Sequence, residues 1–370
     1  VVWEILVRLP AAALLRCRAV CRSWRDLTST SEFLLAHHLR QPSLPLVSFC
    51  GEIDACRRNV DAGLDALDFR RRPAERRPVL RFSDYSRRGS FKVHASCDGL
   101  LLLSLSNNTF YICNPATRQW TTLPSLHGGV AGLYRHSSSG EYRILYKQWT
   151  DEDDFVCYYV RTVASSAKPT CVEPPAASPP MGRTPSVLLH GCIHWPLFQE
   201  KAGLVVFDTV AESFRARRMS CPTVGNSPRA NLFEMDGTLG ISPADESSMV
   251  LKLWVLQDYE TEAWSLKYRI RLPIIEVKRT PYARPPQYSF NGVLVSKEGD
   301  VLFWSDDRSR GHLFHCDSKG KLLQKLHGDH VSSGVSGQWF KESLVRHDFF
   351  ERQDGCRRRR VSQPRFFSGL

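Results

Sequence analysis

The first forty residues place apolar side chains at the spacing of an amphipathic helix. Leu14, Cys17, Cys21 and Trp24 recur at intervals of three or four residues, so they lie along one stripe. Pro10 suits the first position of this helix, where the missing backbone N–H costs nothing. The pattern therefore predicts a helix that begins near residue 10.

A second helix is predicted after the polar residues 29–31. Ser31 can cap it, and its apolar positions are Phe33, Leu34, Leu35 and Leu39. Helices of this length are marginal on their own. We therefore expect the two to pack together or against a partner.

From Phe91 onward the pattern changes to short apolar segments separated by polar turns. Residues 100–105, 110–113 and 119–123 alternate with turns that contain Asn and Pro. This alternation is typical of a β-meander. The pattern returns along the chain, and the similar segments are residues 111–120, 205–214 and 313–322.

Imperfect repetition of a meander predicts a β-propeller, each blade of which is a small antiparallel sheet. A non-repetitive β-sandwich or barrel remains the alternative. We expect a mainly β fold with about six blades over residues 91–345, with a strand near Leu46 completing the ring. Residues 1–41 would form a small helical unit in front of it.

The remaining segments lack this pattern. Pro42 and Pro45 suggest a change from helical to extended structure. Residues 42–90 are interpreted as a linker in which 51–78 form a long basic surface loop, with isolated strands at 44–49 and 79–82. Residues 346–370 are interpreted as a basic C-terminal tail.

Composition indicates an ordinary globular protein. The 370 residues are 42% hydrophobic and 24% charged, and no apolar stretch approaches the length of a membrane span. The 12 cysteines are scattered, and Cys97, Cys113, Cys157 and Cys192 lie in apolar segments. Buried free thiols in a reducing compartment fit this distribution. We therefore expect an intracellular protein of the nucleus, the cytoplasm or both, with no membrane partner.

The formal net charge of +12 comes largely from two arginine-rich runs, residues 70–88 and 357–360. Such runs are usually solvated surface, although they can attract acidic partners or nucleic acid. No nucleic-acid-binding motif accompanies them, and no aromatic stacking platform is interleaved with them. Binding of nucleic acid is therefore not the favoured interpretation.

No catalytic constellation is evident. The sequence has no nucleophile elbow, no phosphate-binding glycine loop and no zinc-protease motif. Cys17 and Cys21 belong to the apolar stripe, and His312 and His315 would face opposite sides of a strand, although Cys316 lies beside them. We therefore expect a non-enzymatic protein with no cofactor and no metal.

Two motifs resemble a known family. Residues 4–10 (EILVRLP) and 14–24 (LLRCRAVCRSW), followed by Ser31-Glu32-Phe33, resemble the plant F-box, without the Leu-Pro segment that usually opens it. We therefore expect residues 1–41 to be an N-terminally truncated F-box. Residues 96–101, 113–117, 139–145, 191–195 and 253–259 resemble the F-box-associated domain, a kelch-like propeller.

The resemblance implies a substrate-recognition subunit of an SCF-type cullin-RING ubiquitin ligase. The F-box would dock on a Skp-family adaptor, and through it on a cullin, while the propeller would bind an unknown target protein. By this resemblance the adaptor-binding residues are Leu9, Pro10, Leu14, Leu15, Val20, Cys21 and Trp24. The alternatives are a β-propeller lectin or enzyme with an incidental helical cap, and a basic nucleic-acid-binding protein.

Overall fold

The computed structural model describes residues 1–50, 60–71, 73–84, 91–105, 109–124, 126, 128–149, 156–163, 165–175, 185–197, 203–215, 219–222, 230–235, 237–243, 250–271, 291–296, 298–307, 310–326, 332–351 and 366–367. Four short helices come first: α1 (Val2–Leu6), α2 (Ala11–Cys17), α3 (Arg22–Leu27) and α4 (Ser31–Arg40). Strands follow, and the helix α6 (Asp348–Glu351) comes after the last strand. None of the helices described is both long and apolar enough to cross a membrane.

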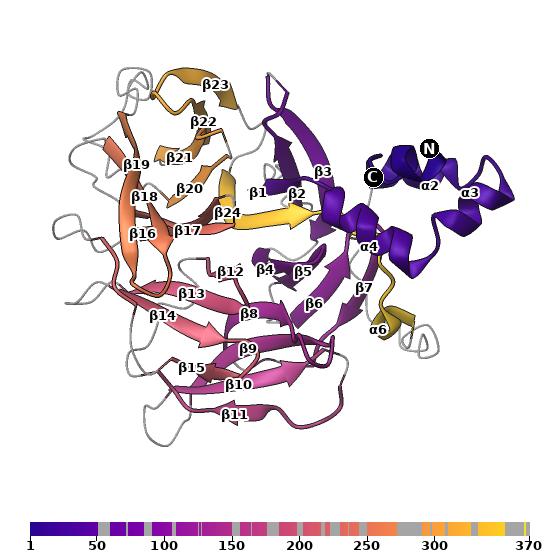
Figure 1. Ribbon diagram of the computed structural model, residues 1–370, viewed down its shortest axis with the longest axis horizontal. Helices are drawn as coiled ribbons and strands as arrows, with labels where there is room; N and C mark the ends of the chain where they lie inside the picture. The colour runs from indigo at the N-terminus through magenta and orange to yellow at the C-terminus, as the bar shows by residue number, and fades with distance from the viewer. Residues whose placement is uncertain are drawn as a thin grey trace.

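The described strands form a six-bladed propeller, as predicted. Six four-stranded antiparallel sheets stand around a common axis, and the helices project from one side of the ring (Figure 1). The sheets are β24–β1–β2–β3 (Ser332–Lys341, Ser43–Cys50, Val60–Asp68, Glu75–Asp84), β4–β5–β6–β7 (Lys92–Cys97, Leu100–Leu105, Thr109–Asn114, Gln119–Thr122), β8–β9–β10–β11 (Gly129–Arg135, Tyr142–Trp149, Val156–Thr162, Thr170–Val172), β12–β13–β14–β15 (Val187–Leu189, Cys192–Leu197, Gly203–Asp208, Ser213–Phe214), β16–β17–β18–β19 (Ala230–Met235, Thr238–Pro243, Val250–Asp258, Ala263–Arg271) and β20–β21–β22–β23 (Asn291–Val295, Val301–Asp307, Arg310–Cys316, Leu322–Leu326).

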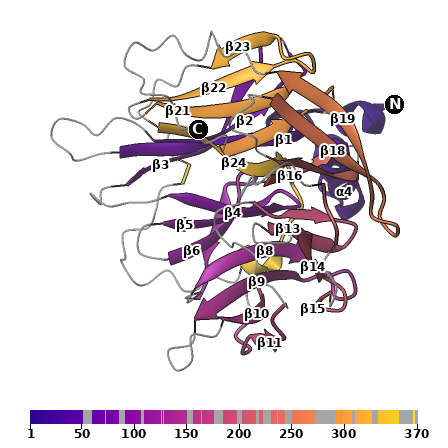
Figure 2. The ribbon, with the colours of Figure 1, turned by 90° about the vertical axis from the view of Figure 1, so that its left-hand side faces the viewer.

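The ring closes by pairing the two ends of the propeller sequence. The last strand, β24, is antiparallel to the first, β1, from Ser43 opposite Lys341 to Cys50 opposite Ser332. The predicted strand near Leu46 therefore does complete the ring. Turned by 90°, the view shows the blades edge-on, with the N-terminus and α4 together at one side (Figure 2).

The predicted surface loop over residues 51–78 is wrong for its described part. Strand β2 pairs with β3 from Val60 opposite Asp84 to Asp68 opposite Glu75, and both belong to the closing blade. Residues 62–68 of β2 are buried, but Asp65 and Asp68 among them are charged and pair with Arg76 and Arg77 of β3. The sequence therefore lacks the continuous apolar pattern from which strands are usually recognised. The predicted strands at 44–49 and 79–82 exist, but they share one sheet.

The predicted repeat corresponds to the hairpin between the third and fourth strands of a blade. In each of the three similar segments an acidic or amide side chain ends the third strand and accepts backbone N–H groups of the turn. Asn114 accepts from Ala116, Asp208 from Val210, and Asp317 from Lys319, at 2.8–3.1 Å. Side chains of this kind stabilise turns by replacing a backbone acceptor. Asp68 and Asp258 do the same in two further blades.

The described part of the predicted C-terminal tail packs against the body. Phe366 is buried, and its ring meets those of Tyr111 and Trp120 edge-on at 5.1 and 5.4 Å. Its carbonyl accepts the N–H of Arg81 in β3 at 3.0 Å. Phe366 therefore packs against both the closing blade, through Arg81, and the next blade, through Tyr111 and Trp120. The arginines 357–360 lie outside the described residues.

Candidate functional site

The four N-terminal helices share one small core. Helix α2 begins at Ala11, one residue later than predicted, so Pro10 is its N-cap residue and not its first helical residue. The carbonyl of Pro10 accepts the N–H of Leu14 at 3.0 Å. Thr30, not Ser31, caps α4 by accepting the N–H of Phe33 at 3.3 Å. The buried apolar members are Leu6, Val7, Ala11, Leu14, Phe33, Leu34 and Leu344. Because Leu344 follows β24, the helical module completes its core with a residue from the far end of the chain.

The structure divides the predicted adaptor-binding residues into core and surface. Leu14 is fully buried in the module core, and Leu9 and Trp24 are half-buried against it. Leu15 and Val20 are 40% and 65% exposed. The remaining two predicted residues, Pro10 and Cys21, are also exposed. The first group therefore supports the module, whereas the second can contact a partner directly.

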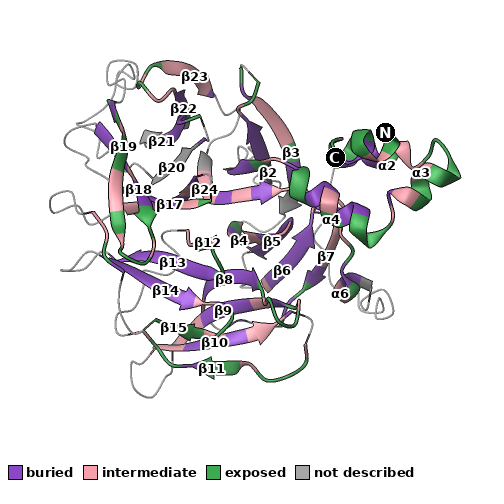
Figure 3. Cartoon of the chain, viewed as in Figure 1, coloured by how far each residue is buried: buried purple, intermediate pink, exposed green. Residues whose placement is uncertain are grey.

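Sequence reasoning missed two exposed apolar residues of α1, Val2 and Ile5. Leu6 and Val7, at the end of this short helix, face the core of the module. Val2 and Ile5 point away from that core and are left exposed. Apolar residues all around a helix indicate either burial or a partner. Val2, Ile5, Leu15 and Val20 are here called the exposed apolar set. Figure 3 shows exposed stretches in green on α1, α2 and α3.

Hydrogen bonds fix the helical module to the end of β24. Glu342 accepts the N–H of Ala11 through its carboxylate at 2.9 Å, and its carbonyl accepts Nδ1–H of His38 at 2.8 Å. Lys341 donates from Nζ to the carbonyl of Leu39 at 2.9 Å. The module is therefore docked on the propeller at several points along its last helix and at the start of α2.

The arginines of the first basic run are largely paired within the closing blade. Arg76 contacts Asp65 at 3.1 Å, and Arg77 contacts Asp68 at 2.7 Å. Arg70 donates to the same Asp68 carboxylate, and this bond holds the pKa of Asp68 below its usual value. Charges compensated in this way attract nucleic acid less strongly than the sequence run suggests. The members of the run beyond residue 84 lie outside the described residues.

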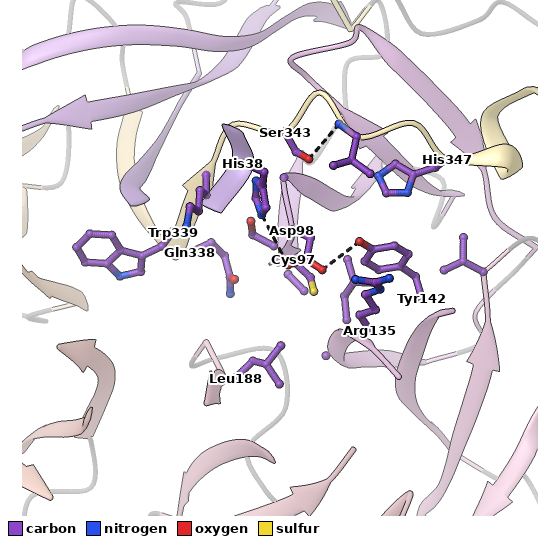
Figure 4. A pocket seen from close by; sticks show the side chains of 18 of the residues that line it. His38, Cys97, Asp98, Arg135, Tyr142, Leu188, Gln338, Trp339, Ser343 and His347 are labelled. Carbon is purple, nitrogen blue, oxygen red and sulfur yellow. Dashed lines mark hydrogen bonds and ion pairs between the residues drawn. The ribbon is translucent and has the colours of Figure 1, made fainter. Parts of the chain in front are cut away.

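A cavity of about 1270 Å³ lies between the helical module and the propeller. Helix α4 forms part of its wall, and the inner strands β4, β8, β12, β16 and β24 of five blades form most of the rest. Figure 4 shows His38 above Asp98, with Arg135 and Tyr142 on one side of the space, Leu188 below and Trp339 on the opposite side. Segments far apart in the sequence therefore meet around one hollow.

Asp98 is the polar centre of this cavity. Its carboxylate lies 3.8 Å from Nε2 of His38 and accepts the hydroxyl of Tyr142 at 3.0 Å (Figure 4). The contact with His38, and next to it the bond from Tyr142, holds the pKa of Asp98 below its usual value. Asp98 and Gly99 both adopt positive φ, at 50° and 83°, as a two-residue type I′ hairpin requires. The carboxylate of Asp98 therefore lies in the wall of the cavity because the tight turn between β4 and β5 holds it there.

His347 lines the cavity, and its ring stacks on that of Phe349 with a centroid distance of 5.1 Å. Burial lowers the pKa of its imidazole to about 4, so the ring is neutral at physiological pH. Its Nε2 is buried without a hydrogen-bond partner in the described part of the chain. A buried polar atom of this kind is available to a ligand or a water molecule.

The metal candidates of the sequence do not converge in the described structure. His315 is buried and contacts the Asp300 carboxylate at 3.0 Å, while the side chain of His312 lies outside the described part. Among the described residues no group of three or more potential ligands is close enough to hold a metal ion.

The sequence matches two family descriptions, "F-box associated beta propeller domain" over residues 77–349 and "F-box-like" over residues 1–41. The first match spans most of the chain and covers the propeller from within β3 onward, and the second coincides with the helical module. The chain therefore belongs to the F-box associated β-propeller family, and an F-box-like unit precedes its propeller.

Similar proteins are named as F-box proteins. F-box protein CPR1 of Arabidopsis thaliana is 26% identical over 352 residues, which is 84% of this chain and 82% of the relative. F-box protein At5g49610 of the same plant is 25% identical over 303 residues, or 75% and 79% of the two chains. Among solved structures, a protein of unknown function from Bacteroides caccae aligns with a TM-score of 0.43 and 12% identity, over 80% of this chain and all of that one.

Proposed function

We propose that this protein is a substrate receptor of an SCF-type cullin-RING ubiquitin ligase. The helical module would bind a Skp-family adaptor, and through it a cullin, while the propeller would hold the target protein. A receptor of this kind needs no catalytic residue, because holding the target near the bound ubiquitin-conjugating enzyme raises its effective concentration. Such a role places the protein inside the cell, in the nucleus, the cytoplasm or both.

The observation that carries this proposal is the exposed apolar set on the F-box-like module. Val20, in the turn after α2, and Ile5 of α1 are 65% and 57% exposed although the module has a packed core. Apolar side chains that remain uncovered on a module with a complete core are typical of an interaction surface. The match of residues 1–41 to the F-box-like family supports an adaptor as the partner.

The test is co-expression of the whole chain with a plant Skp-family adaptor, followed by size-exclusion chromatography and a titration of affinity. We expect a one-to-one complex. The exchanges Leu15→Asp and Val20→Asp should each weaken it by about ten-fold or more, because each places a charge in an apolar contact.

The matched control is Leu266→Asp, which changes an apolar residue of β19 that is 43% exposed. This residue lies on the propeller, away from the helical module. We expect the control to bind the adaptor normally. The proposal fails if the unmodified chain forms no complex, or if the two module variants bind as tightly as the control.

A further inference from the structure

A second pocket, of about 630 Å³, lies where helix α2 faces the turn between β6 and β7. Four arginines line it, and among the described residues no Asp or Glu does. The helical module supplies Arg16 and Arg18, and the propeller side supplies Arg118 of the β6–β7 turn and Arg346 after β24. This site is here called the arginine pocket. Like charges from the two ends of the chain and from one blade are therefore brought together without a lining carboxylate.

Arg18 is the fixed member of the arginine pocket. Its Nε donates to Oγ1 of Thr28 at 3.2 Å, and Nη2 donates to the carbonyl of the same residue at 2.6 Å. Burial lowers the pKa of Arg18, and the nearby positive charge of Arg346 lowers it further. A guanidinium group stays charged at physiological pH. Two cations therefore repel each other across the boundary between the module and the propeller, and hydrogen bonds keep one of them in place.

Arg118 occupies a turn position at which two other blades carry a glutamate with a partner. Its φ is 56°, and Glu212 and Glu262 take the equivalent position with φ of 50° and 55°. Glu212 contacts Arg143 at 2.7 Å. Glu262 accepts the N–H of Ser220 at 2.8 Å. The guanidinium group of Arg118 forms no hydrogen bond or ion pair with any described residue, so it is available in the arginine pocket.

The neighbouring groups do not neutralise this pocket. Arg16 and Arg346 are exposed, and neither forms an ion pair with a described residue. Asp348 lines the larger cavity but not the arginine pocket, and the carboxylate of Glu342 accepts a backbone N–H at the start of α2. Nε2 of His347, a residue that lines the pocket and is 9% exposed, has no hydrogen-bond partner in the described part of the chain. The site therefore combines uncompensated cations with an unpartnered buried nitrogen.

Four uncompensated cations favour an anion with more than one negative charge. A carboxylate carries one charge, whereas a phosphate ester carries about −1.5 to −2 at pH 7 and offers three acceptor oxygens. Guanidinium groups bind phosphate oxygens in bidentate geometry. A volume of about 630 Å³ suits one small ligand or one side chain, whereas nucleic acid requires a longer run of phosphate contacts.

We propose that the arginine pocket binds a phosphate group. Its oxygens are held by Arg118 and Arg346 from the propeller side and by Arg16 and Arg18 from the helical module. Nε2 of His347 serves a further oxygen when it carries the imidazole proton. The group belongs to a free phosphorylated small molecule or to a phosphorylated side chain, since both present the same oxygens.

A phosphate in this pocket has a structural consequence. It contacts α2 and the β6–β7 turn together, so binding ties the helical module more firmly to the propeller. Leu15 of the exposed apolar set also lines the pocket, so the phosphate lies beside the proposed adaptor surface. The inference itself does not depend on the receptor function, because the pocket is formed by this chain alone.

The test is isothermal titration calorimetry of the full chain at a constant ionic strength of about 0.15 M. The probes are pyrophosphate and two short Gly-Ala peptides, one with a central phosphoserine and one with glutamate in its place. We expect saturable one-to-one binding of at least one phosphate probe. Binding of pyrophosphate alone indicates a small-molecule ligand, and tighter binding of the phosphoserine peptide indicates a phosphorylated side chain. Arg346→Gln and Arg118→Asn, which keeps a residue that tolerates positive φ, should each weaken binding about ten-fold.

A matched control and a second readout separate this site from general attraction of anions. Arg269→Gln removes an exposed arginine of β19 outside the pocket and should leave the affinity unchanged. Pyrophosphate should slow amide hydrogen exchange of α2 and of the β6–β7 turn in the unmodified chain but not in Arg118→Asn. No saturable binding of either phosphate probe, equal affinity for the glutamate peptide, or an equal loss in Arg269→Gln would each overturn the inference. Because these titrations contain no adaptor, their outcome is separate from that of the receptor test.

Discussion

Nε2 of His38, in the last turn of α4, lies 3.8 Å from the carboxylate of Asp98, in the turn between β4 and β5. This contact joins the helical module to the propeller across sixty positions of sequence. Asp98→Asn removes the charge but keeps a residue that tolerates positive φ. In a double-mutant cycle with His38→Gln, we expect a coupling free energy of about 0.5–1 kcal/mol, since Asp98 is partly exposed.

The measurement is urea unfolding of the four proteins of this cycle at neutral pH. Amide hydrogen exchange of residues 1–41 reports whether the module opens more often when the contact is lost. Strictly additive single effects would show that the two side chains are neighbours without an energetic coupling.

Leu14 and Leu15 are adjacent in sequence but should respond oppositely to substitution. Leu14 is fully buried, so Leu14→Ala should destabilise the helical module by about 2–5 kcal/mol through the cavity it leaves. Leu15 is partly exposed, so Leu15→Ala should change stability by less than about 1 kcal/mol while weakening the adaptor complex. Limited proteolysis of the module and adaptor titration measure the two properties separately. Equal protease sensitivity of the two variants would contradict the assignment of Leu14 to the core.

His194 should make the propeller less stable in acid. It is fully buried; Nδ1–H donates to the carbonyl of Val187 at 3.2 Å, and Nε2 accepts the hydroxyl of Tyr259 at 2.6 Å. Burial lowers its pKa from 6.5 to about 4, so its contribution is complete above pH 6.5 and is lost as the pH falls through 4. The loss from this group amounts to roughly 3 kcal/mol.

The check is a series of urea unfolding curves between pH 7.5 and about 4. His194→Gln should reduce the dependence on pH, with the remainder coming from His94 and His347, whose pKa burial also lowers to about 4. The control Lys168→Gln replaces an exposed residue outside the neighbourhood of His194 and should leave the pH dependence unchanged. Identical slopes for the unmodified chain and His194→Gln would refute this prediction.

Asn114 should not tolerate the aspartate that occupies the equivalent turn position in other blades. Its Oδ1 accepts the N–H of Ala116, but its Nδ2 donates to the carbonyl of Ser343 at 3.0 Å in a buried setting. Asn114→Asp keeps the acceptor and places a carboxylate against that carbonyl, at a cost of about 1–3 kcal/mol. Asp208→Asn, at the exposed equivalent turn, should cost less than about 0.5 kcal/mol. Thermal unfolding of both variants distinguishes the two outcomes.

Local sequence was enough to predict helical structure over residues 11–40 and the repeated hairpins, but not α1 or the break between α2 and α3. The spacing of Leu14, Cys17, Cys21 and Trp24 predicted one helix, but the structure has two, α2 and α3, because a turn at residues 18–20 interrupts the chain and leaves Cys21 exposed at the start of α3. The Asn and Asp residues at 114, 208 and 317 mark turns that the structure contains. These features depend on neighbours within a few residues, so their physical cause is visible in the sequence. The residue identities of the module also predicted its family, which the comparisons confirm.

Tertiary structure decided the features that depend on contacts between residues far apart in the sequence. Strands β2 and β3 pair along their length and bury Leu64 and Leu80 in the blade core. Asp65 and Asp68 meet arginines across the sheet, a contact that hydrophobic periodicity does not report. The burial of Leu14 and exposure of Leu15 depend on the packing of Phe33 and Leu344.

The cavity between α4 and the propeller likewise needs α4, the β4–β5 turn and the end of β24 in one place. The sequence by itself thus determined the module, the repeat and the family. The closure of the ring, the division of the helical residues into core and surface, and the cavity were set by long-range packing, because each requires contacts between segments separated by tens to hundreds of residues.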